Sequence, residues 1–123
     1  EEYNLFMEIF SDLMNSIVSR DLMGALECGE TVASLESREK QKAFCNFAGD
    51  CIRKIFMVQQ NMKHIAGLDS QEEEFFTRVA GQCGNGFCTR TIANIEKVVS
   101  LIDRNVNSKI LFCDLVNRMF LSV

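Results

Sequence analysis

The chain has 123 residues, a formal net charge of −4 and 47% hydrophobic residues, which is the size and balance of one ordinary globular domain. Its basic residues form no stripe, and its apolar runs fall far short of the roughly 20 residues of a membrane helix, so we expect no nucleic-acid binding and no membrane span. Residues 1–123 are therefore predicted to form a single domain.

A first helix is predicted over residues 5–18, where the polar residues fall on one narrow stripe and the rest of the circumference is apolar. Such a helix must be covered on two sides, and we expect it in the core. The alternatives are a face toward a second copy of the chain and a wall of an apolar pocket. The candidate interface or pocket residues are Phe6, Met7, Phe10, Met14 and Val18.

A second helix is expected over residues 20–35, with Ser19 as its cap. The third and longest helix is predicted from Ser37, which caps its first turn, to Gly67, which closes it. At 1.5 Å per residue this helix would run roughly 45 Å. We expect it to be the central helix around which the chain is organised.

Three further helices are predicted in the second half of the chain. Asp69 or Ser70 begins a helix with carboxylates in its first turn, which ends at Gly81. Another begins at Thr91, and the last begins at Asn107 or Ser108. The chain has no proline and no long alternating pattern of the kind that strands show. The expected fold is all-α, with about six helices in a compact, disulfide-braced bundle.

The six cysteines are Cys28, Cys45, Cys51, Cys83, Cys88 and Cys113. An even and dense set of cysteines favours disulfides. The competing explanation, a zinc site, does not fit the spacing, because no C-x2-C pair is present and the single histidine, His64, is far from any close pair. Disulfides imply an oxidising compartment, so we expect a secreted, extracellular protein.

Antiparallel helices bring residues equidistant from their turn face to face, which favours particular pairs of cysteines. The favoured pairs are Cys28 with Cys45 and Cys51 with Cys83. Cys88 is then left for Cys113, although the midpoint of this pair misses the predicted turn at Asn105 by about five residues. An exchange of Cys83 and Cys88 stays open. No metal and no cofactor is expected.

Short motifs between residues 28 and 117 follow a particular order. They are Cys28, Lys42-Ala43-Phe44 ahead of Cys51-Ile52, the close pair Cys83 and Cys88, Ile95-Glu96-Lys97-Val98-Val99, and Cys113 beside Asp114-Leu115-Val116-Asn117. This order resembles the stanniocalcins, a family of secreted helical hormones. The chain departs from that family in the extra Cys45, in lacking its cysteine-rich N-terminal segment, and in having no N-x-S/T sequon. The resemblance implies a signalling protein linked to calcium and phosphate balance, or one that binds a protease.

No catalytic motif is evident, so we expect a binding protein and not an enzyme. The favoured function is a secreted, disulfide-stabilised helical protein that binds a receptor or another extracellular protein, as a hormone-like or effector-like ligand, with a homodimer as a further option. The alternative is a secreted carrier of a small hydrophobic ligand such as a lipid or an odorant-like molecule. Ten phenylalanines and six methionines would make adaptable apolar walls for such a ligand.

Overall fold

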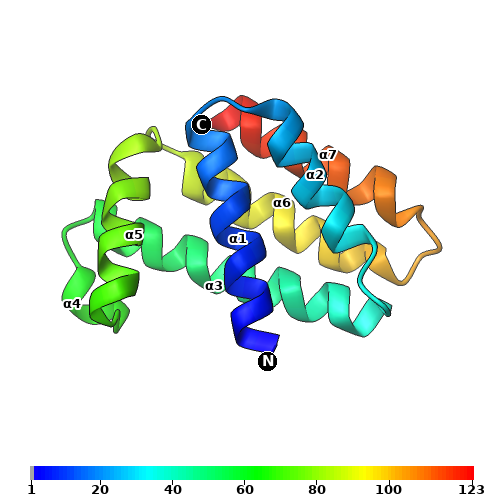
Figure 1. The fold of residues 1–123 in the computed structure, drawn as a ribbon, viewed down its shortest axis with the longest axis horizontal. Helices are drawn as coiled ribbons and strands as arrows, with labels where there is room; N and C mark the ends of the chain where they lie inside the picture. The colour runs from blue at the N-terminus through cyan, green and yellow to red at the C-terminus, as the bar shows by residue number, and fades with distance from the viewer. Residues whose placement is uncertain (1) are drawn as a thin grey trace.

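The computed structural model describes residues 2–123, and this part of the chain is all-helical, as predicted (Figure 1). Its helices are α1 (Glu2–Val18), α2 (Leu22–Ala33), α3 (Arg38–Gln59), α4 (Lys63–Ala66), α5 (Ser70–Gln82), α6 (Phe87–Ile102) and α7 (Ser108–Ser122). Seven helices replace the expected six, because the long third helix is divided. In addition, α6 begins about one turn earlier than the predicted start at Thr91.

The predicted helix from Ser37 to Gly67 ends early, at Gln59. Asn61 adopts a positive φ of 61°, and the amide of Met62 turns back to the carbonyl of Met57 at 2.8 Å. Gly67 has a φ of 70° and closes the short α4 instead, in the manner of a left-handed C-cap. With 22 residues, α3 is about 33 Å long and is still the longest helix.

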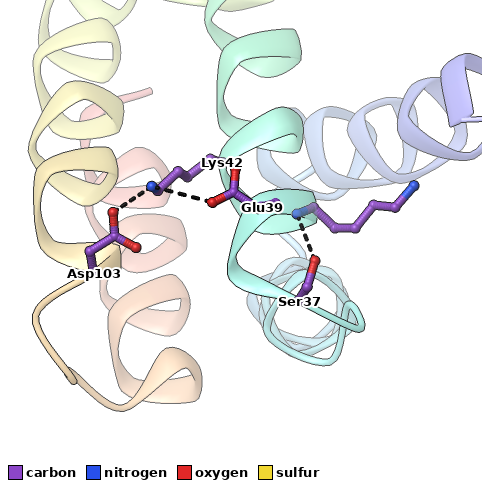
Figure 2. A network of polar contacts seen from close by, with 5 residues as sticks. Ser37, Glu39, Lys42 and Asp103 are labelled. Carbon is purple, nitrogen blue, oxygen red and sulfur yellow. Dashed lines mark hydrogen bonds and ion pairs between the residues drawn. The ribbon is translucent and has the colours of Figure 1, made fainter.

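The predicted cap at the start of α3 is confirmed. Ser37 accepts a hydrogen bond from the amide of Lys40 at 3.1 Å. One turn further, Lys42 forms an ion pair with Glu39 at 3.8 Å and another with Asp103 at the end of α6 (Figure 2). Both carboxylates are exposed, so these ion pairs add little to stability, but they connect the start of α3 to the end of α6.

The starts of α2, α5 and α7 also follow local capping chemistry. Asp69 and Glu72 form a reciprocal capping box at the start of α5, which confirms the predicted start. The predicted cap Ser19 is wrong, because Arg20 has a positive φ and α2 begins two residues later. Asp21 is the actual cap, and its carboxylate accepts from the amide of Gly24 at 3.0 Å.

The core lies around α1, which contacts α2, α3, α5 and α7. α2 lies along α7, while α3 packs chiefly against α6 and α5. Figure 1 shows α2 and α7 side by side at one end of the molecule and α4 with α5 at the other. The large side chains with less than 2% exposure include Phe10, Phe76, Phe87, Phe112, Met14, Ile17, Ile52 and Ile55.

The predicted disulfides are not present, and all six cysteines are free thiols. The pairing of Cys28 with Cys45 assumed that α2 folds back along α3. Instead α2 lies along α7, and Cys45 lines a groove that α3 forms with α6. The two thiols therefore belong to different helix interfaces.

The other two predicted pairs fail on register. Gln59 donates to the carbonyl of Cys83 at 3.2 Å, so Cys83 lies about two turns of α3 away from Cys51. Similarly, Arg90 donates to the carbonyl of Ser122 at 3.1 Å. The start of α6, which carries Cys88, therefore lies beside the end of α7 and about two turns away from Cys113.

Replacing Phe10 with alanine should lower the free energy of unfolding by about 3–5 kcal/mol, because the ring is fully buried and its removal leaves a cavity. Urea denaturation followed by circular dichroism measures the change. Leu121→Ala is the control, since Leu121 is 73% exposed and should change stability by less than about 0.5 kcal/mol. Equal effects of the two substitutions would contradict the burial of α1.

Two glycines should respond to substitution in opposite directions. A Cβ atom at Gly29 would lie 3.1 Å from Val116 Cγ2 and 3.3 Å from the carbonyl oxygen of Phe112, whereas one at Gly81 meets nothing within 4 Å. Gly29→Leu should therefore destabilise the protein by about 1–3 kcal/mol through overpacking. Gly81→Ala should stabilise it by up to about 1 kcal/mol. Thermal melts of both variants test the close approach of α2 to α7.

Candidate functional site

The start of α1 and the connection between α2 and α3 enclose a surface groove of about 390 Å³, which we call the Leu5 groove. It is lined by Glu2, Leu5, Phe6, Ser34, Leu35, Glu36 and Lys40. Three separate segments therefore build it: the first turns of α1, the α2–α3 connection and the first turn of α3. Its volume is at the lower end of the range for ligand sites in proteins.

The floor of the Leu5 groove is apolar. Leu5 is 44% exposed, whereas Phe6 is only 3% exposed. The ring of Phe6 packs edge-on against Phe44 at 5.5 Å between centroids, and it contacts Phe47 at 5.9 Å. An exposed leucine and a buried ring of an aromatic cluster therefore line the same groove.

The rim of the Leu5 groove is charged. Lys40 Nζ lies 2.8 Å from a carboxylate oxygen of Glu2, and the hydrogen bond and charge of Glu2 raise the pKa of Lys40. Glu36 adds a second carboxylate on the same rim. Since Glu2 and Lys40 neutralise each other, the rim has one excess negative charge.

A buried glutamine follows Lys40 of the Leu5 groove in the chain. Gln41 is 4% exposed, donates to the carbonyl of Ala33 at 3.2 Å and accepts from the hydroxyl of Ser108 at 3.4 Å. These contacts join α3 to the end of α2 and to the start of α7. The hydrogen bond to Ala33 thus ties α3 to the end of α2, two residues before Leu35.

Tyr3 anchors the first turn of α1 from the side of α5. Its hydroxyl donates to the carboxylate of Glu72 at 2.5 Å, and its ring packs edge-on against Phe47 at 5.6 Å. The hydrogen bond to Glu72, followed by desolvation, raises the pKa of Tyr3 to about 12. Both ends of the turn that presents Leu5 are therefore tied to neighbouring helices.

The structure places the five predicted α1 residues in two environments. Phe6, Phe10 and Met14 are buried in the chain's own core, while Met7 and Val18 are partly buried and pack against that core. Only Phe6 lines the Leu5 groove. The burial of Phe6, Phe10 and Met14 agrees with the core interpretation, and a face toward a second copy stays a prediction.

A second groove, of about 330 Å³, lies between α3 and α6 and is polar. Arg53 lies in it and contacts Asp50 at 3.4 Å and Glu96 at 3.7 Å. Within residues 2–123 no group of three His, Cys, Asp or Glu side chains is arranged to hold a metal ion. No helix in this part of the chain is long and apolar enough to cross a membrane.

Comparisons with models of protein families, with curated proteins and with solved structures found no match. The resemblance to stanniocalcins stays a prediction for this reason. Sequence reasoning also missed Leu35, Glu36 and Lys40 as site residues. Leu35 is at the end of the second predicted helix, whereas α2 ends at Ala33 and leaves Leu35 in the connection to α3.

The ionisation of the only tyrosine tests the anchor at Glu72. We expect Tyr3 to titrate near pH 12 and not near its ordinary value of about 10. Since the folded-state pKa is raised, the contribution of Tyr3 to stability is complete below about pH 10 and is lost as the pH rises toward 12. Ultraviolet absorbance of the phenolate measures the titration. Glu72→Gln should move the midpoint down, and an unchanged midpoint would contradict the contact.

Proposed function

We propose that this chain is a helical binding protein that takes up an apolar side chain of a protein partner in the Leu5 groove. The observation that carries the proposal is a half-exposed leucine that lines a groove of about 390 Å³ together with the buried ring of Phe6. Apolar pockets of this size typically receive one or two anchor side chains of a partner protein.

Charge defines the chemistry of the partner further. The rim has one excess carboxylate, and the chain as a whole has a formal charge of −4. Complementary charge speeds association and suppresses wrong partners. The partner is therefore a protein segment in which an apolar anchor is next to lysine or arginine.

The carrier function is the weaker alternative. Most of the phenylalanines that suggested an adaptable cage fill the core, among them Phe10, Phe76, Phe87 and Phe112. The larger hollows are surface grooves of about 330–410 Å³. The extracellular location and the hormone-like or effector-like role stay predictions, because they were inferred from disulfide bonds and the cysteines of the structure are free.

Selection from a random peptide display library tests the proposal without knowledge of the partner. The immobilised protein should enrich peptides with a large apolar residue beside lysine or arginine. Leu5→Glu should abolish the enrichment, because it places a charge over the apolar floor. Leu121→Glu is the matched control, since Leu121 is also exposed but lies at the end of α7, and it should enrich the same peptides as the unmodified chain.

Failure to enrich any such peptide, or equal enrichment by the Leu5→Glu variant, would contradict the proposal. Weaker retention at high salt should accompany the correct peptides, because salt screens the rim charges. Extraction of the purified protein with organic solvent, followed by mass spectrometry, tests the alternative. A stoichiometric lipid in the extract would favour the carrier.

A further inference from the structure

Two cysteines flank the tight connection between α5 and α6. Cys83 follows the last residue of α5, and Cys88 lies in the first turn of α6. Between them, Gly86 has a φ of 85°, and the amide of Phe87 donates to the carbonyl of Gly84 at 3.3 Å. The connection has only four residues, Cys83 to Gly86, so the two cysteines are separated by one short turn.

The side-chain amide of Gln59, at the end of α3, contacts both cysteine residues. Its Nε2 donates to the carbonyl of Cys83 at 3.2 Å and to that of Ala80 at 3.1 Å. Its Oε1 accepts from the thiol of Cys88, whose Sγ lies 3.6 Å away. One amide group thus holds the backbone of one cysteine and the sulfur of the other.

The two thiols differ in access. A surface groove of about 410 Å³ is lined by Phe56, Gln59, Cys83, Asn85 and neighbouring residues of α5. Cys83 lines this groove and is 9% exposed, whereas Cys88 is 1% exposed. Of the two, Cys83 is therefore the thiol that a small reagent is expected to reach first.

We propose that Cys83 and Cys88 form a thiol–disulfide exchange site that a small disulfide such as oxidised glutathione closes. The Cys83 thiolate attacks one sulfur of glutathione disulfide, forms a mixed disulfide and releases one glutathione thiolate, which takes up the proton that Cys83 lost. The Cys88 thiol then loses its proton and attacks the Cys83 sulfur. This step breaks the mixed disulfide and releases the second glutathione. Two thiols are oxidised and one glutathione disulfide is reduced to two glutathione molecules.

Selectivity for this pair comes from proximity and not from acidity. Burial raises the pKa of Cys83 to about 11 and that of Cys88 to about 12, and for Cys88 the nearby Cys83 charge contributes to the rise. Burial also raises the pKa of Cys28 to about 11 and that of Cys45 to about 12. Since all these thiols are weakly acidic, a close second thiol is what distinguishes Cys83. Exchange should be slow at neutral pH and faster at higher pH.

Closure changes the contacts at the base of the groove. Once the Cys88 sulfur is bonded to Cys83, it has no hydrogen to donate to Gln59 Oε1, so that oxygen loses its partner. The two amide hydrogen bonds from Gln59 Nε2 to α5 do not involve either sulfur. Oxidation is therefore expected to preserve the helices and to alter the groove locally.

Incubation of the reduced protein with glutathione disulfide, followed by acid quench, alkylation and trypsin digestion, tests the proposal. Cleavage after Arg78 and Arg90 leaves both cysteines on one peptide, residues 79–90. The expected product is this peptide without alkyl groups and lighter by two hydrogens. Its rate of formation should rise with pH until the protein unfolds.

Three variants, each checked for folding by circular dichroism, separate the steps. Cys88→Ser should retain one glutathione on Cys83, and Cys83→Ser should give neither product. Cys45→Ser removes an equally buried thiol elsewhere and should behave as the unmodified chain. The proposal is overturned if peptide 79–90 remains fully alkylated while Cys28 or Cys113 takes up glutathione. A disulfide from Cys83 to any other peptide would overturn it as well.

Discussion

The need to cover α1 determines how the other helices are arranged. This helix is apolar around more than half of its circumference, and four helices, α2, α3, α5 and α7, contact it. Because α2 and α3 both use it as a common support, they do not need to fold against each other, and α2 pairs with α7 instead. Because of this packing, Cys28 and Cys45 lie at different helix interfaces. The absence of the predicted bridge between them therefore follows from the hydrophobicity of a helix that contains neither cysteine.

The features that the sequence predicted correctly are local ones. Ser37 caps α3 and Asp69 forms a capping box with Glu72, since both depend on residues within one turn. The break at Asn61 carries no comparable signal, because neither glycine nor proline marks it. Helix register also depends on which helices become neighbours, so the symmetry argument placed Cys83 opposite Cys51 when it lies near Gln59. Local chemistry thus indicates where helices begin, but tertiary packing decides which residues meet.

The same distinction applies to the candidate sites. Phe6 was predicted as a site residue because it lies on the apolar helix, but its neighbours Leu35 and Lys40 come from another part of the chain. The roles of Gln41 and Gln59 were not predictable, because glutamine in a long helix is ordinarily a solvated residue. In the structure the side-chain amide of each glutamine forms hydrogen bonds with residues outside α3. Their positions near the two ends of α3 show that hydrogen bonds from side-chain amides help to connect this helix to its neighbours.

The Leu5 groove and the Cys83–Cys88 site lie at opposite ends of α3, and this separation makes them independent. The helix is about 33 Å long, and its central residues Ile52 and Ile55 are fully buried. Coupling between distant sites requires an element with two alternative arrangements that both sites influence. A helix whose middle is held in a close-packed core offers only one arrangement. Closure of the disulfide should therefore leave peptide binding at the Leu5 groove unchanged, since the lost hydrogen bond at Gln59 is confined to the far end of the helix.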